Sequence, residues 1–160
     1  MSEDLKVSPE ELKMLMDHPG QLVAYVDGSY EHSMGRYAYG CVYLTPEGDI
    51  VTECGGDNKE EVATARNVAG EMLGAMHAVK WCMEKGYKSI KIFYDYEGIE
   101  KWARGMWKTN KPLTKKYAEY MRRQMERIDI SFEKVVAHTG DKYNEMADKL
   151  AKQGLLQDEE

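Results

Sequence analysis

The chain has 160 residues, of which 42% are hydrophobic, a size that fits one compact domain with a single core. Its formal net charge of −6 argues against a uniformly basic surface that would bind a polyanion along its whole length. Three cysteines without C-x-x-C spacing argue against a disulfide framework and a structural zinc site. The acidic start argues against a secretory signal, and the lack of a long apolar run argues against a membrane span. We therefore expect a cytoplasmic protein without membrane partners.

The first 20 residues predict a short acidic arm. Ser8-Pro9-Glu10-Glu11 is a capping signal for one brief helix, which His18-Pro19-Gly20 ends. We expect residues 1–20 to be peripheral to a domain that spans residues 21–155 and is followed by an acidic tail at 156–160.

Three antiparallel strands are predicted next. Leu22–Val26 is an apolar run that leads into Asp27-Gly28-Ser29, and Tyr37–Leu44 is rich in aromatic and β-branched residues. A turn at Pro46-Glu47-Gly48-Asp49 separates the second strand from a third at Ile50–Cys54.

A long amphipathic helix is predicted from Thr64 to Lys85, because apolar residues recur there at helical spacing and Gly86 is a natural stop. Lys88–Tyr94 alternates as a strand does and ends at Asp95. The remaining predicted elements are helices at Gly98–Met106 and Thr114–Arg127, a strand at Ile130–Ala137, and a final helix at Tyr143–Lys152 that Asn144 could cap. The order βββαβααβα contains no repeat and predicts an α/β fold with helices packed on a sheet.

Four acidic residues lie on four separate predicted elements: Asp27, Glu71, Asp95 and Asp148. If the first and fourth strands pair, Asp27 and Asp95 lie close together, because neighbouring strands are about 4.8 Å apart. Two ionised carboxylates about 5 Å apart repel by roughly 3 kcal/mol at an effective dielectric of 20, and a bound divalent cation removes that repulsion. Oxygen ligands suit Mg²⁺ or Mn²⁺ over zinc. With 28 acidic residues in the chain, spacing alone also allows four ordinary surface carboxylates.

The sequence around these acids resembles the type 1 ribonuclease H family from Leu22 to Gly154. The matching runs are Ala24-Tyr-Val-Asp27-Gly-Ser29, Arg66-Asn67-Val-Ala-Gly-Glu71, Phe93-Tyr-Asp95 and His138-Thr-Gly140-Asp-Lys-Tyr-Asn144-Glu-Met-Ala-Asp148. Tyr94–Trp102 further resembles the cellular bacterial branch, whose members sometimes carry an N-terminal hybrid-binding module that we do not expect here.

The resemblance implies an RNase H-like fold with a mixed five-stranded sheet. It also implies an enzyme that hydrolyses the RNA strand of RNA–DNA hybrids with two Mg²⁺ ions, for which Mn²⁺ could substitute, leaving 5′-phosphate and 3′-hydroxyl ends. We expect the enzyme to act as a monomer. The implied metal ligands are Asp27, Glu71, Asp95 and Asp148, and the catalytic set adds His138, a loop histidine suited to proton transfer.

The resemblance also implies a set of substrate-binding residues. Asn67, Glu71 and the backbone at Gly28 and Ser29 match positions that contact an RNA 2′-hydroxyl, the group that distinguishes RNA from DNA. Trp102 matches an aromatic residue that lines the channel for the DNA strand.

Two departures from the family pattern concern the grip on the nucleic acid. Ser33 and Arg66 replace an Asn and a Thr of the family's phosphate pocket, although Arg66 could still hold a phosphate. The stretch from Lys101 to Lys116 contains six basic residues and no acid, and could replace a longer basic segment.

Two other functions remain open at this point: a domain that binds hybrids without cutting them, and a DNA nuclease or recombinase of the same fold superfamily.

Overall fold

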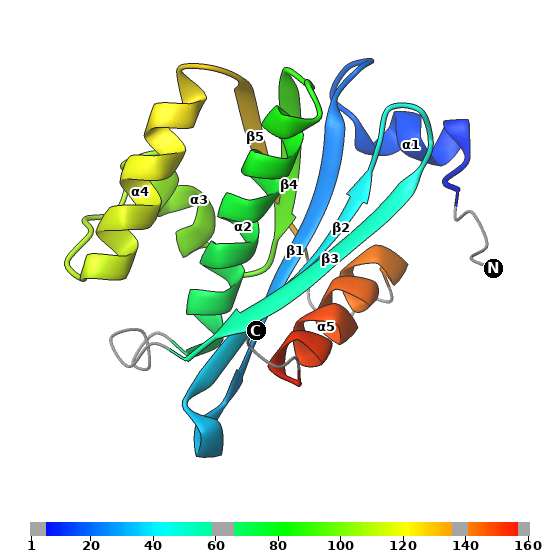
Figure 1. Cartoon of the computed structure of the whole chain (residues 1–160). Coiled ribbons are helices and arrows are strands. Elements are labelled where there is room, and N and C mark those ends of the chain that lie inside the picture. The colour runs from blue at the N-terminus through cyan, green and yellow to red at the C-terminus, as the bar shows by residue number, and fades with distance from the viewer. Residues whose placement is uncertain (1–5, 59–65, 136–140, 157–160) are drawn as a thin grey trace.

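The computed structural model describes residues 6–58, 66–135 and 141–156, with the side chains of Met34, Arg66 and Asn67 left aside. Within this part of the chain, five strands form one sheet in the order β3-β2-β1-β4-β5 (Figure 1). The strands are β1 (Leu22–Glu31), β2 (Arg36–Leu44), β3 (Ile50–Asp57), β4 (Ser89–Tyr94) and β5 (Asp129–Lys134). Neighbours among β1, β2 and β3 are antiparallel, whereas β4 is parallel to β1 and to β5. The predicted mixed sheet and element order are confirmed.

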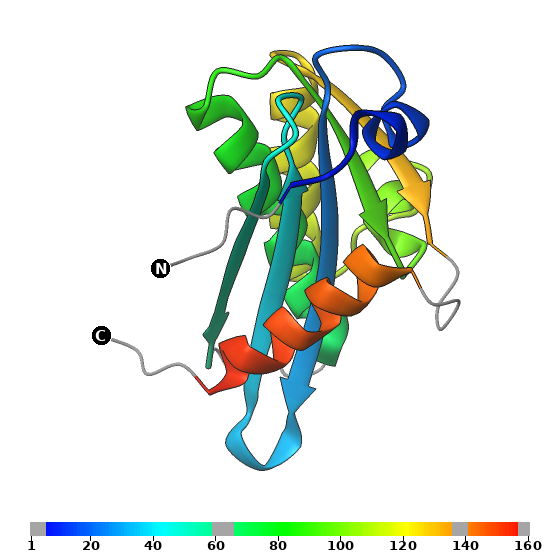
Figure 2. The same ribbon diagram turned by 90° about the vertical axis from the view of Figure 1, so that its right-hand side faces the viewer.

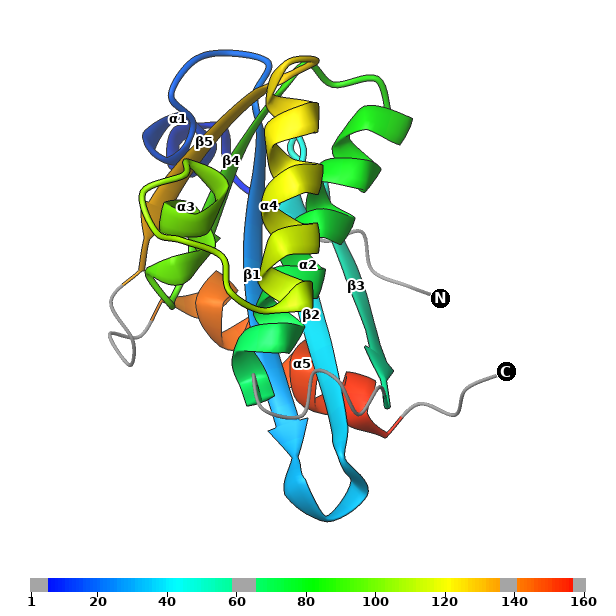
Figure 3. The same ribbon diagram turned by 90° about the vertical axis from the view of Figure 1, so that its left-hand side faces the viewer.

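Helices cover both faces of this sheet. On one face lie α2 (Arg66–Glu84), α3 (Gly98–Ala103) and α4 (Pro112–Met125) (Figure 3). On the other face lie α1 (Pro9–Leu15) and α5 (Lys142–Leu155), as Figure 2 shows from the opposite side. A short 3-10 turn, η1 (His32–Met34), joins β1 to β2.

The alternation of side chains along β1 explains how one strand serves both layers. Leu22, Ala24 and Val26 belong to a buried cluster with α2, α3 and α4. Val23 and Tyr25 point the other way, into a second cluster with α1 and α5. A strand buried on both faces reads as a continuous apolar run, which is the pattern of Leu22–Val26.

Two apolar residues of the N-terminal arm join this second cluster, whereas most of the arm's described residues are exposed. Val7 and Leu12 are buried there. The predicted cap is confirmed, because the Ser8 hydroxyl accepts the Glu11 N–H at 3.1 Å. Lys91, itself buried, holds the end of α1 by donating to the Leu15 carbonyl and pairing with Asp17 at 3.0 Å.

Two predicted helix ends differ from the structure. The final helix is capped by Asp141, whose carboxylate accepts the N–H groups of Tyr143 and Asn144, so the cap assigned to Asn144 is wrong. The helix α3 ends at Ala103 because Gly105, at φ +76°, adopts a left-handed conformation that a helix cannot continue through.

The three cysteines, Cys41, Cys54 and Cys82, are free thiols. In the described ranges, no helix has the length and apolar character needed to cross a membrane.

Candidate active site

The register of β1 and β4 brings two of the four predicted acids together. Tyr25 is paired with Phe93 in the parallel ladder, and the same register continued by two residues places Asp27 opposite Asp95. Asp95 directly follows the last residue of β4. The first and fourth strands thus pair, which is the condition under which Asp27 and Asp95 lie close together, and both residues lie at the carboxyl-terminal end of β4.

Two glycines allow the helices to approach Asp27 from opposite faces. A Cβ at Gly70 of α2 would overlap the Ala38 carbonyl and come within 3.0 Å of the Gly28 Cα. On the other face, a Cβ at Gly40 would overlap the backbone of α5 at Ala147. Gly70 directly precedes Glu71, and Gly40 is paired with Asp27 across the β1–β2 ladder. The close packing at these glycines therefore brings Glu71 and Asp148 to the same part of β1.

Glu71 is held by the backbone of the β4–α3 turn. Its side chain is only 4% exposed. One carboxylate oxygen accepts the Asp95 N–H at 2.6 Å, and both accept the Tyr96 N–H at 3.3 and 3.4 Å. These bonds tie the first turns of α2 to the end of β4, so Glu71 fixes the position of Asp95 as well as adding its own charge.

Burial and mutual repulsion perturb two of these carboxyls. Burial raises the pKa of Glu71 to about 8, against the lowering effect of the Asp95 N–H, and the charges of Asp27 and Asp95 raise it further. Burial also raises the pKa of Asp27 to about 7, and Asp148 and Asp95 contribute in the same direction. Asp27 and Asp95 thus act on the charge of Glu71, and Asp148 and Asp95 act on the charge of Asp27, so the four acids share one electrostatic environment.

The donor set suits a hard divalent cation, although the side chains are not closed around one. In the residues described, no group of three or more His, Cys, Asp or Glu side chains is arranged so that it could hold a metal ion. Glu71 is bonded to backbone amides, and Asp148 pairs with Lys152 at 3.2 Å, one turn along α5. Carboxylate oxygens are nevertheless the ligands that Mg²⁺ and Mn²⁺ prefer. Burial first, and then the charges of neighbouring acids, raise the pKa of Asp27 and Glu71, and a cation would relieve the repulsion among them, so the residues fit such ions.

The remaining predicted site residues fall into two groups. Gly28 and Ser29 follow Asp27 on β1 and are half-buried, and the Gly28 N–H donates to the Asp27 carboxylate at 2.9 Å. Arg66 and Asn67 begin α2, but their side chains lie outside the described part of the structure, as does the whole of His138. Their predicted roles stay predictions.

Trp102 lies in an aromatic cluster next to Asp95. Its ring is 5.8 Å from both Tyr96 and Trp107, and those two rings are 6.1 Å apart. The Lys101 ammonium lies 5.3 Å from the Trp107 ring centre. Sequence reasoning singled out Trp102 and missed Tyr96, which is 39% exposed beside the acids; its position directly after Asp95 was the available signal.

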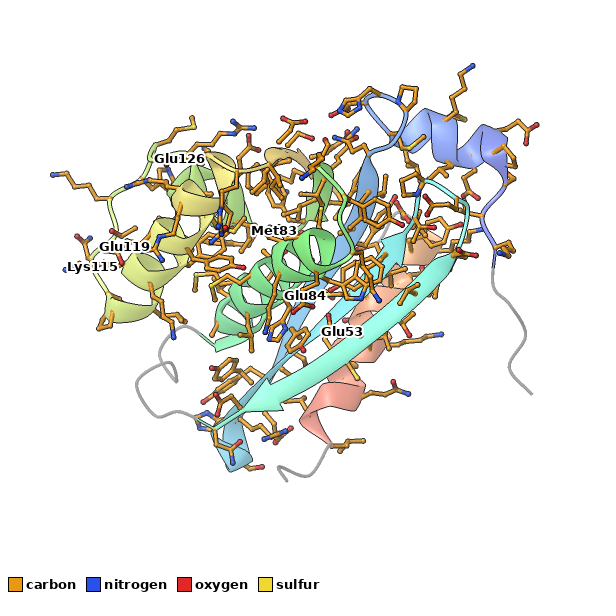
Figure 4. The ribbon with its side chains drawn as sticks, turned by 45° about the horizontal axis from the view of Figure 1, so that its top comes forward. Glu53, Met83, Glu84, Lys115, Glu119 and Glu126 are labelled. Carbon is orange, nitrogen blue, oxygen red and sulfur yellow. The ribbon has the colours of Figure 1, made fainter. Side chains whose placement is uncertain are left out.

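The predicted basic stretch does not extend unbroken along α4. Lys108 and Lys111 precede the helix and are exposed. On α4 itself Lys115 and Lys116 are followed by Glu119, and Glu126 caps the end of the helix; Figure 4 labels Lys115, Glu119 and Glu126 there, with Met83 and Glu84 on α2 and Glu53 on β3. Lys101 and Arg104 are paired within α3 to Glu97 and Glu100, both at 2.7 Å. Exposed basic residues therefore lie both at the α3–α4 connection, with Lys108 and Lys111, and along α4, with Lys115, Lys116, Arg122 and Arg123.

Comparisons with known proteins place this arrangement in a family. The sequence model of the RNase H family matches residues 19–156. Ribonuclease HI of Halobacterium salinarum is 30% identical over 139 residues, which cover 87% of this chain and 66% of that protein. The crystal structure of RNase H1 from the same organism superimposes with a TM-score of 0.67 at 29% identity, covering 84% of this chain and 97% of that one. The structure of LC11-RNase H1 in complex with an RNA/DNA hybrid has the same fold, with a TM-score of 0.64 at 17% identity, over 84% of this chain and 99% of that one.

Proposed function

The chain belongs to the RNase H family, and on that premise we propose that it hydrolyses the RNA strand of RNA–DNA hybrids at the acidic site formed by Asp27, Glu71, Asp95 and Asp148. The observation that carries the proposal is the meeting of the first three acids at the carboxyl-terminal end of β4, with the charge of Asp148 close enough to raise the pKa of Asp27. Crowded carboxylates beside a phosphate backbone weaken simple binding, so a domain that only binds hybrids gains nothing from them.

The four carboxylates would hold two divalent cations, for which Mg²⁺ is the proposed species and Mn²⁺ a substitute. When bound, the pair supplies positive charge to both the attacking and the departing oxygen of a phosphodiester. Asp27 would hold the cations together with Asp95 and Asp148, the two carboxylates whose charges raise its pKa after burial has done so.

The protein's own residues would orient the substrate. Glu71 keeps the β4–α3 turn in place through the Asp95 and Tyr96 N–H groups. Gly28, Ser29 and Asn67 would contact the RNA 2′-hydroxyl, and His138 would assist proton transfer, leaving 5′-phosphate and 3′-hydroxyl ends. Trp102 and Arg66 would contact the DNA strand. The exposed lysines around the α3–α4 connection would add salt-sensitive phosphate contacts.

One cleavage assay tests the proposal. A 5′-labelled RNA–DNA hybrid, a duplex RNA and a duplex DNA of one sequence are incubated with the protein in Mg²⁺, in Mn²⁺ and in chelator. We expect the RNA strand of the hybrid alone to be cut, and only with a divalent ion. Binding of the hybrid without cutting in either ion would favour a non-catalytic domain, and cutting of duplex DNA would favour a DNA nuclease.

A further inference from the structure

Three aromatic rings form a layer on the face of the sheet that α1 and α5 cover. Tyr25 of β1 stacks on Phe93 of β4, with ring centres 4.5 Å apart and planes 7° from parallel. Tyr143, in the first turn of α5, lies 5.5 Å from Tyr25 at an angle of 42°. All three side chains are at most 5% exposed. The layer therefore joins two strands and one helix through direct ring contacts.

Each ring lies a short distance along the chain from one of the proposed metal ligands. Tyr25 precedes Asp27 by two residues on β1, so the two side chains point to the same face. Phe93 precedes Asp95 by two residues, and Tyr143 lies in the first turn of the helix that carries Asp148, which follows it by five residues. The contacts that set the spacing of the rings thus also set the spacing of three carboxylates.

The hydroxyl of Tyr143 adds a link to the N-terminal arm. It donates to the Glu11 carboxylate of α1 at 3.1 Å, and the neighbouring Lys142 ammonium lies 3.6 Å from the same oxygen. The arm in turn is fastened to the sheet by Lys91 and by the burial of Leu12. Residues 6–18 lie outside the segment, residues 19–156, that matches the family model.

We propose that Tyr143 is a positioning residue for the acidic site: its ring, packed on Tyr25, and its hydroxyl, held by Glu11, fix the start of α5 and thereby the distance of Asp148 from Asp27 and Asp95. This inference rests on the proposed function. It also assigns the N-terminal arm an indirect role in the site: the arm supports α5, and this role does not require the arm to contact the nucleic acid.

The test compares Tyr143 with a second buried tyrosine that has the same surroundings on the opposite face. Tyr43 is fully buried, stacks on Trp81 at 4.4 Å, and donates its hydroxyl to Glu53 at 2.5 Å. The variants are Tyr143→Leu, Tyr143→Phe and Glu11→Ala, with Tyr43→Leu and Tyr43→Phe as matched controls. For each we would measure Mn²⁺ binding by calorimetry, kcat and KM on the hybrid, and the midpoint of thermal unfolding.

We expect Tyr143→Leu to weaken Mn²⁺ binding and to lower kcat by about 10-fold or more, as loss of a group that orients a ligand does, with KM for the hybrid within about twofold of the wild-type value. Tyr143→Phe keeps the ring and should recover most of that loss. Tyr43→Leu should lower the unfolding midpoint without changing Mn²⁺ binding. If Tyr143→Leu does not fold, the variants Tyr143→Phe and Glu11→Ala provide the test. Each should weaken Mn²⁺ binding by roughly twofold. The double variant should weaken it no further, because both changes remove the same hydrogen bond between Tyr143 and Glu11.

Two results overturn the inference: unchanged Mn²⁺ binding in the folded Tyr143 variants, or an equal loss in the Tyr43 controls. If the wild-type protein binds Mn²⁺ and cuts the hybrid while the Tyr143 variants match it, this inference alone fails. If the wild-type protein does neither, the proposed function fails and this inference fails with it.

Discussion

Asp27 is paired with Gly40 across the β1–β2 ladder, and Gly40 is also the residue on which the backbone of α5 rests at Ala147. The missing side chain at Gly40 therefore determines how closely Asp148, the next residue of α5, approaches Asp27. One position on β2 controls a distance between two other elements.

Gly40→Ala should consequently reduce both stability and activity. The added Cβ would overlap the Ala147 carbonyl, and because that neighbour is backbone, α5 must move as a whole. Overpacking of this kind costs about 1–3 kcal/mol. We expect a loss of that size in urea unfolding, together with at least a tenfold (~1.4 kcal/mol) loss of hybrid cleavage.

Gly74→Ala is the matched control for this change. A Cβ there would come no closer than 3.3 Å to the Tyr39 side chain, and alanine is favoured over glycine inside a helix. Its activity should equal that of the wild-type protein. If Gly40→Ala behaved in the same way, the close approach of α5 would have no importance for the site.

Asp27→Asn and Asp95→Asn should each abolish cleavage of the hybrid while the protein stays folded. Asparagine has nearly the same shape as aspartate but lacks the negative charge that would hold a divalent cation. We expect kcat to fall at least about 100-fold, or about 2.7 kcal/mol of transition-state stabilisation, with an unchanged circular dichroism spectrum. Either variant cutting the hybrid at the wild-type rate in Mg²⁺ would refute the assignment of that ligand.

Glu71→Gln should stabilise the protein at alkaline pH in the absence of divalent ions. The pKa of Glu71 is raised from 4.5 to about 8, so the folded state keeps a proton that the unfolded chain releases near pH 4.5. This stability is fully present below pH 4.5 and is lost as pH rises to 8, by up to about 1.4 kcal/mol per unit. Glutamine has no such titration and can still accept the Asp95 N–H.

The measurement for Glu71 is urea unfolding of both proteins in chelator at pH 5 and pH 8. The difference in the free energy of unfolding between the two pH values should be smaller in Glu71→Gln than in the wild-type protein. Activity in Mg²⁺ should be lost in the variant. An identical pH dependence of the two proteins would show that the pKa of Glu71 is not raised in the folded state, so that the group is already ionised at pH 5.

Lys108→Gln and Lys115→Gln should weaken hybrid binding and its dependence on salt. Both lysines are exposed near the α3–α4 connection, where they can reach phosphates. Each phosphate contact removed should reduce the slope of log K against log salt by about 1. Lys13→Gln, an exposed change on α1 at the other face, should leave the slope unchanged. Equal slopes for all three variants would place the hybrid elsewhere on the protein.

The sequence by itself determined the order of the elements and the α/β class, and its resemblance to the RNase H family singled out the four acids as candidates. These follow from local signals: the spacing of apolar residues within a helix or strand, turn residues between them, and short runs such as Phe93-Tyr-Asp95. The cap at Ser8 was predicted for the same reason, because the capping side chain and its partner at Glu11 lie within one helical turn.

Only the tertiary structure decided how these elements meet. Three features depend on residues that are far apart in the chain. Glu71 is buried against the Asp95 backbone, and Gly40 and Gly70 let two helices pack closely on β1. The N-terminal arm contacts Tyr143 through Glu11. Periodicity shows which face of an element is apolar and carries no information about which other element covers that face. The arm was therefore expected to be peripheral; most of its described residues are exposed, but Val7 and Leu12 fill a place that β1, β4 and α5 leave open together.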